Sequence, residues 1–79
     1  MTRTEILAQV NEVFHDVFDD DTLVIQEETT AADVDGWDSL MHITLITEIE
    51  DAFGFKFGMK DVLGMQNVGE MLTIIEENV

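Results

Sequence analysis

The stretch Asp35-Gly36-Trp37-Asp38-Ser39-Leu40-Met41 lies near the middle of the chain, where an irregular segment gives way to the most apolar helical pattern. Asp38 is a good helix N-cap, because its carboxylate can accept hydrogen bonds from the free N–H groups of a first turn. Ser39, the only serine, is then expected to open the helix near the positive end of its dipole. Such a position favours an anion, so Ser39 is better suited to carrying a phosphate ester than to hydrolysis.

The same two residues have a simpler interpretation. An Asp-Ser pair at a helix start is common, and most such pairs only cap the helix. The rest of the chain therefore has to decide between a structural cap and a modification site.

The composition indicates one small acidic domain spanning residues 1–79. The hydrophobic fraction of 46% is enough for a core, and 18 acidic residues against 3 basic ones give a net charge of −15. Nucleic acid is a poor partner for this charge, because phosphate binding needs clusters of Lys and Arg. An anionic membrane surface is disfavoured for the same reason. Basic patches on other proteins are the expected complement.

The sequence contains no cysteine, so a disulfide, a thiolate metal site and a cysteine nucleophile are excluded. No apolar secretion signal opens the chain, and no apolar run approaches membrane-spanning length. We therefore expect a cytoplasmic protein, acting as a monomer.

A first helix is predicted from Arg3 to Phe18. Thr2 and Glu5 have the spacing of a capping box, and Asp19-Asp20-Asp21 should end the helix because acids oppose the dipole there. His15 falls on the polar side and is expected at the solvated surface. The apolar positions recur at helical spacing, namely Ile6, Leu7, Val10, Val13, Phe14, Val17 and Phe18.

The segment between this helix and Asp38 shows no sustained period. A loop of about twenty residues is long for a compact domain, and such loops are often functional. Leu23 and Ile25 are expected to anchor it, with one or both tucked underneath, and residues 29–32 could form a short helical turn.

A second helix is predicted from Ser39 to Phe53. His42 is expected to be exposed on it. The predicted inward stripe is Leu40, Ile43, Leu45, Ile46, Ile49 and Phe53. The residues expected to point elsewhere, as a candidate partner face, are Met41, Thr44, Glu48 and Asp51.

Two further helices complete an all-α prediction. Gly54 fits the left-handed residue after the second helix, and Phe55-Lys56-Phe57 is predicted to be an extended connector with buried aromatic rings. A short helix from Met59 to Leu63 is closed by Gly64. Asn67, with Glu70 three residues later, should cap a last helix that reaches about Glu77. Its inward residues are Val68, Met71, Leu72 and Ile75. The fold class is a small antiparallel bundle of three long helices and one short helix with a long first loop.

In this setting the triplet Asp38-Ser39-Leu40, with Gly36 three residues before the serine, resembles the acyl carrier protein family and its peptidyl and D-alanyl relatives. The resemblance covers essentially the whole chain. It implies that a phosphopantetheinyl transferase attaches 4′-phosphopantetheine from coenzyme A to Ser39, and that acyl groups ride on its thiol as thioesters. Asp38 and Leu40 are implied to be motif neighbours that cap the helix and contact the transferase. The implied protein is no enzyme, and presents substrates to acyl-loading and acyl-processing enzymes with basic docking patches.

The chain departs from the family pattern around the motif. Fatty-acid carriers usually place acids in the first turn after the serine, whereas Met41, His42 and Thr44 stand here and acids return only at Glu48. Asp35 replaces the apolar residue common before the glycine, and Trp37 is expected to supply the packing that Asp35 does not. These departures favour a stand-alone, pathway-specific carrier over the housekeeping fatty-acid carrier.

The cargo remains open between two kinds of acyl group. A fatty-acid-like or polyketide-like chain is favoured by flexible apolar residues expected near the second and third helices, although each of them could be ordinary core. These residues are Met59, Met65, Met71, Phe53, Phe55 and Phe57. An aminoacyl cargo, as in D-alanyl or peptidyl carriers, uses the same attachment chemistry.

A third alternative is an acidic calcium-binding or interaction module. Asp33, Asp35 and Asp38 around Gly36 superficially resemble an EF-hand loop. The spacing fails, because placing Gly36 at its loop position puts Ala31 and His42 where Asp and Glu ligands are required. No metal site is therefore predicted.

Overall fold

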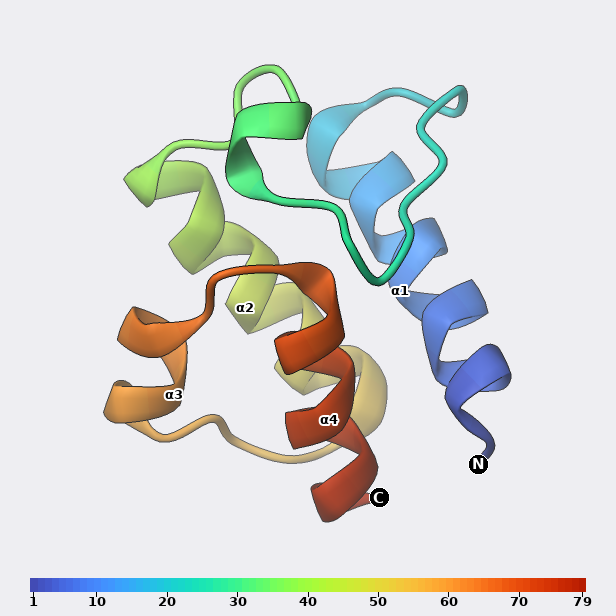
Figure 1. Ribbon diagram of the computed structural model, residues 1–79, viewed down its shortest axis with the longest axis vertical. Helices are drawn as coiled ribbons and strands as arrows, with labels where there is room; N and C mark the ends of the chain where they lie inside the picture. The colour runs from blue at the N-terminus through green and yellow to red at the C-terminus, as the bar shows by residue number, and fades with distance from the viewer.

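The computed structural model describes all residues 1–79 and is entirely helical. Its elements are α1 (Arg3–Phe18), a 3₁₀ helix η1 (Ala31–Asp33), α2 (Ser39–Phe53), α3 (Met59–Gly64) and α4 (Val68–Asn78). In Figure 1, α1 runs upward, α2 and α4 run downward, and short α3 lies to one side. The predicted bundle of three long helices and one short helix is confirmed. None of these helices combines the length and apolar character needed to span a membrane.

Local signals place the helix ends where the sequence predicts them. The Thr2 hydroxyl accepts from the Glu5 amide at 3.2 Å, and the Glu5 carboxylate accepts from the Thr2 amide at 2.9 Å. The bond from the Thr2 amide favours the charged form of the Glu5 carboxylate and lowers its pKa. At the other end of α1, Asp19 takes the left-handed conformation (φ 51°), which Asp tolerates better than most residues. Asn67 caps α4 by accepting from the Glu70 amide at 2.9 Å.

The core is apolar throughout and draws on three helices and the first loop. Within that loop Ile25 and Val34 are buried, Leu23 is half-buried and Val24 is exposed, so the predicted anchoring of the loop by Leu23 and Ile25 is confirmed. The buried side chains are Ile6, Val10, Phe14, Ile25, Val34, Leu45, Ile46, Ile49, Val68, Met71, Leu72 and Ile75.

The first loop is tied to α1 by polar side chains, and this overturns one prediction. His15 is half-buried rather than solvated, with its Nε2 atom 2.7 Å from the Leu23 carbonyl oxygen. Asn11 donates to the Ile25 carbonyl at 3.1 Å and accepts from the Ile25 amide at 2.7 Å. The loop folds back over the polar side of α1, so His15 and Asn11 serve backbone groups that water would otherwise satisfy.

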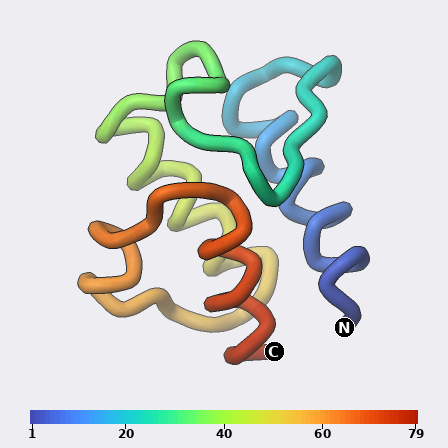
Figure 2. Tube along the Cα trace, viewed as in Figure 1, coloured from blue at the N-terminus to red at the C-terminus, as the bar shows by residue number.

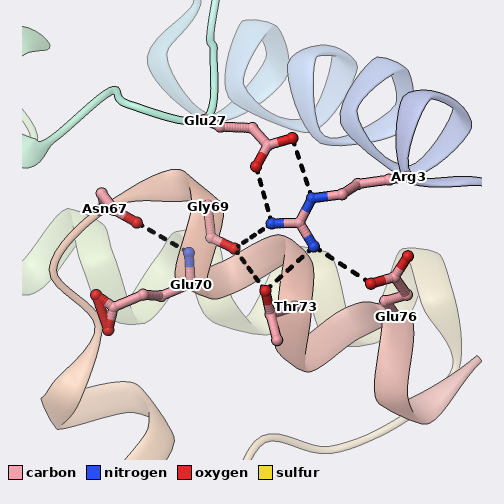
Figure 3. A network of polar contacts seen from close by, with 7 residues as sticks. All are labelled: Arg3, Glu27, Asn67, Gly69, Glu70, Thr73 and Glu76. Carbon is pink, nitrogen blue, oxygen red and sulfur yellow. Dashed lines mark hydrogen bonds and ion pairs between the residues drawn. The ribbon is translucent and has the colours of Figure 1, made fainter.

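Arg3 joins α1, the loop and α4 in one polar network (Figure 3). Its guanidinium donates to both carboxylate oxygens of Glu27, at 3.0 and 2.9 Å, and to the Gly69 carbonyl at 2.9 Å. It also reaches Thr73 at 3.1 Å and Glu76 at 3.3 Å. The hydrogen bonds with Glu27 raise the pKa of Arg3, and the guanidinium lowers the pKa of the Glu27 carboxyl in return.

Backbone hydrogen bonds complete the join between the loop and α4. The Gly69 amide donates to the Glu27 carbonyl at 2.8 Å, and the Val68 amide donates to the Thr29 carbonyl at 2.9 Å. Figure 2 shows the loop dipping toward the start of α4. A Cβ atom on Gly69 would lie 3.1 Å from the Glu27 carbonyl oxygen, so this close approach depends on glycine.

The connector between α2 and α3 is extended, as predicted, but its rings are only half-buried. Phe55 and Phe57 pack on each other with their centroids 4.8 Å apart. The Phe57 amide donates to the Glu50 carboxylate at 2.8 Å. Gly54, with φ 75°, ends α2 in the predicted left-handed conformation.

Candidate functional site

Ser39 is the first residue of α2, and its side chain is exposed. Asp38 has extended backbone, and its Oδ1 atom accepts from the Met41 amide at 2.9 Å, which is the predicted N-cap. The first amides of a helix have no intrahelical partner, so the backbone presents free donors beside Ser39. The structure therefore gives this hydroxyl both access to solvent and a local preference for negative charge.

A tight turn sets the direction in which the chain enters α2. The Trp37 amide donates to the Val34 carbonyl at 3.2 Å, and the Asp38 amide donates to the Gly36 carbonyl at 3.0 Å. Gly36 has φ 85°, a left-handed conformation that L side chains rarely adopt. Val34 is buried and fixes the turn to the core. Val34 was not predicted to be buried, although an apolar residue between two acids was a usable signal.

Trp37 packs between the turn and α1. Its ring meets Phe14 edge-on with centroids 5.2 Å apart, and it lies 6.4 Å from Phe18. Edge-to-face pairs at such distances are favourable beyond the area they bury. The expectation that Trp37 supplies packing in place of Asp35 is confirmed, since Asp35 is exposed.

His42 is half-buried, and the prediction that it would be exposed is wrong. Its Nδ1 atom lies 3.1 Å from Trp37 Nε1, and its Nε2 atom lies 3.2 Å from the Val62 carbonyl oxygen. The two rings stack with centroids 5.9 Å apart. His42 shares a face with the buried Leu45 and Ile49, three and seven residues later. That spacing was a signal for burial.

The outward face of α2 also differs from the prediction. Leu40 is 76% exposed and Ile43 is 55% exposed, so neither belongs to the inward stripe. Met41, expected on the partner face, is half-buried instead. The apolar pattern of α2 is wide enough to fit several rotations, and packing against α1 selects the one that buries the residues Leu45, Ile46 and Ile49. Thr44, Glu48 and Asp51 are exposed.

A groove of about 480 Å³ opens beside Ser39, between the start of α2 and α3. We call it the Ser39 groove. Asp38 is its only acidic residue, which is unusual in a chain with a net charge of −15. Its volume lies within the range of about 300–1,000 Å³ typical of small-molecule sites. Its lining residues are Ala31, Trp37, Asp38, Ser39, His42, Ile43, Val62, Leu63, Met65, Gln66 and Asn67.

Only part of the predicted apolar lining reaches this groove. Met65 lines it. Met71 is buried in the core, and Met59 is 74% exposed. The remaining candidates, Phe53, Phe55 and Phe57, pack against the core from outside it. Of the six residues expected near the second and third helices, Met71 thus belongs to α4 and the core, and only Met65 reaches the groove.

Three comparisons with known proteins bear on this site. Residues 8–75 match the family model described as the phosphopantetheine attachment site. Over 77 residues the chain is 29% identical to the meromycolate extension acyl carrier protein of Mycobacterium leprae, covering 98% of this chain and 67% of that protein. The protein of the same name from Mycobacterium tuberculosis is 27% identical over 77 residues, with the same coverage.

A solved structure has the same fold. The solution NMR structure of the holo acyl carrier protein from Geobacter metallireducens matches with a TM-score of 0.85 and 36% sequence identity. The match covers 91% of this chain and 83% of that one. The helices, the first loop and the entry into α2 thus belong to a known arrangement.

Proposed function

Because the chain belongs to the acyl carrier protein family, we propose that residues 1–79 form one acyl carrier domain and that Ser39 is the attachment residue for 4′-phosphopantetheine. The observation that carries this assignment is the position of Ser39. It is the only serine of the chain, it is exposed, and it opens α2 directly after its N-cap. The hydroxyl acts as a tether in this proposal, and partner enzymes perform the chemistry.

The residues around Ser39 fit the prosthetic group. Unpaired amides and the helix dipole favour the negative charge of a phosphodiester at this point. The Ser39 groove begins at the same residue and offers apolar walls to what the arm bears. When bound, phosphopantetheine supplies the terminal thiol on which acyl groups are carried as thioesters.

The groove favours an acyl cargo over an aminoacyl one. Most of its side chains are uncharged, and its one carboxylate, Asp38, already accepts the Met41 amide. An ammonium group would find one counter-ion there, on a carboxylate that also caps α2, whereas a hydrocarbon chain would meet Ile43, Val62 and Leu63. We therefore place the protein in fatty-acid-like or polyketide-like biosynthesis.

The exposed side of α2, which carries Leu40, Ile43, Thr44, Glu48 and Asp51, suggests what kind of partner surface the carrier meets. We call it the open face of α2. Leu40 and Ile43 are apolar and exposed next to Ser39, while Glu48 and Asp51 lie further along the helix. A phosphopantetheinyl transferase and acyl-processing enzymes would then present an apolar contact near their active site. Basic side chains on the partner would lie about two and a half to three helical turns further along α2 from Ser39, where they meet the carboxylates.

Intact-protein mass spectrometry tests the attachment. The protein is incubated with coenzyme A and a promiscuous phosphopantetheinyl transferase. We expect one added phosphopantetheine on the wild type and none on Ser39→Ala. Thr47→Ala, which removes another exposed hydroxyl of α2, should still be modified. An unmodified wild type, or a modified Ser39→Ala, would overturn the proposal.

A panel of loading enzymes tests the cargo. The modified protein is incubated with acyl-loading enzymes and with amino-acid-adenylating enzymes, and the products are identified by intact-protein mass spectrometry. We expect thioesters of unbranched or keto acyl groups. Loading only with D-alanine or another amino acid would replace the acyl assignment by the aminoacyl one.

A further inference from the structure

Three elements meet at the inner wall of the Ser39 groove through two hydrogen bonds. Trp37 comes from the turn before α2, His42 from α2 itself and Val62 from α3, and all three line the groove. The indole N–H can only donate, so His42 Nδ1 accepts. The Val62 carbonyl can only accept, so His42 Nε2 carries the proton and donates. One neutral histidine thus uses both ring nitrogens to join the wall.

This histidine ties α3 to α2. The bond from His42 to the Val62 carbonyl is the one hydrogen bond that joins α3 to another helix. On its outer side α3 exposes Met59, at 74%, and Leu63, at 78%. Besides this bond, the half-buried Val62 side chain packs α3 against the core.

Trp37 separates the groove from the core. One part of its ring contacts the fully buried Phe14 edge-on, at 5.2 Å between centroids, and another part lines the groove. The stacked His42 ring holds the indole in this place through the bond to Nε1. A chain that approaches Phe14 from the groove therefore meets the Trp37–His42 pair first.

We propose that the Trp37–His42 pair is a partition that sets the length of acyl chain accepted by the Ser39 groove, with His42 as the positioning residue. The inference rests on the proposed attachment at Ser39. Acyl chains that fit the groove are shielded along Ile43, Val62 and Leu63. Longer chains leave their ends in solvent, because the partition blocks the way toward Phe14.

The experiment uses holo protein loaded at Ser39 with butanoyl, octanoyl, dodecanoyl or hexadecanoyl groups, with each loading checked by intact mass. The first readout is the thermal midpoint of each acyl form minus that of the holo form. The second is the emission of Trp37, the only tryptophan, which reports directly on the partition. For the wild type we expect the midpoint to rise with chain length and then level off, with an emission shift on loading.

His42→Leu keeps an apolar side chain but removes both hydrogen bonds. We expect the thermal midpoint of this variant to level off later than that of the wild type, at an acyl chain at least one step longer in the series. Trp37→Phe keeps an aromatic ring and loses the N–H donor, so its midpoints should shift in the same direction. His15→Leu is the matched control, because His15 also bonds a backbone carbonyl, that of Leu23, but lies outside the groove. Its profile should equal that of the wild type.

The outcomes separate this inference from the proposed function. A wild type that cannot be modified or loaded at Ser39 overturns both. A fully loaded wild type without levelling overturns the partition alone, and so does a His42→Leu profile identical to the wild type. An equal shift in His15→Leu would overturn it too, because the effect would then follow from lost stability rather than from the wall of the groove.

Discussion

Arg3 and Glu27 form a bidentate ion pair, in which Nε and Nη2 of the guanidinium lie 3.0 and 2.9 Å from the two carboxylate oxygens. The pair links the first turn of α1 to the middle of the first loop, and the same guanidinium continues to Gly69 on α4. Arg3 is one of only three basic residues in a chain with 18 acids. The loop that precedes Ser39 is therefore held at its midpoint by a scarce positive charge.

The pair makes stability depend on pH in a defined direction. The pKa of Glu27 is lowered chiefly by its hydrogen bond to Arg3, so its contribution is full above the unfolded pKa and is lost as pH falls through the folded value. We expect Glu27→Gln to lower the urea midpoint at neutral pH and to shrink the loss on acidification. Because this pair is partly exposed, the change should be modest.

Glu12→Gln is the control for that experiment, since it removes the same charge from an exposed site of α1. It relieves self-repulsion in the acidic chain without touching the network. Equal midpoints for both variants at neutral pH would contradict a role of the ion pair.

Gly69→Ala tests the close join between the loop and α4. The new Cβ would lie 3.1 Å from the Glu27 carbonyl oxygen and 3.2 Å from the Asn67 side-chain oxygen, both already held by hydrogen bonds. We expect an overpacking cost of about 1–3 kcal/mol, partly offset by the better helix propensity of alanine, about 1 kcal/mol. Denaturant unfolding measures the net loss.

Gly64→Ala is the matched comparison, because a Cβ there meets nothing within 4 Å and Gly64 also lies in a helix. It should be neutral or stabilising. Equal free energies of unfolding for Gly69→Ala and Gly64→Ala would mean that the loop can shift away from α4 without loss of stability.

Two isoleucines one turn apart test the rotation of α2. Ile46 is 5% exposed and Ile43 is 55% exposed. Ile46→Ala should destabilise the fold by about 2–5 kcal/mol through lost burial and a cavity. Ile43→Ala should stay within about 0.5 kcal/mol, yet reduce turnover by partner enzymes if the open face is their contact. Similar unfolding energies for the two variants would show that the face is assigned wrongly.

The bonding of His42 predicts a single tautomer in the neutral ring. Nitrogen-15 chemical shifts of the imidazole should show the proton on Nε2, because Nδ1 accepts from Trp37 and Nε2 donates to the Val62 carbonyl. In Trp37→Phe the Nδ1 shift should move, since its donor is gone. A proton found on Nδ1 in the wild type would contradict the arrangement.

Much of the fold was predictable because its signals are local. Each signal for a helix end acts within a few residues, and the helix ends follow from these signals. They are the Thr2–Glu5 capping box, the N-caps Asp38 and Asn67, and the left-handed Gly54. The inward residues of α4 were also identified correctly, because a single narrow apolar stripe allows one rotation. For α2, whose apolar residues surround more of the helix, the pattern allowed several.

The sequence by itself determined the helices, the acidic character and the place of Ser39 at the start of α2, since these depend on local spacing and composition. Only the tertiary structure decided which face of α2 is open and that His15 and His42 are half-buried. It also placed the Arg3 guanidinium against the Gly69 carbonyl, and it formed the groove beside Ser39 from Trp37, His42 and α3. These features need contacts between residues far apart in the chain, and such contacts exist only once the core has fixed the helices in place.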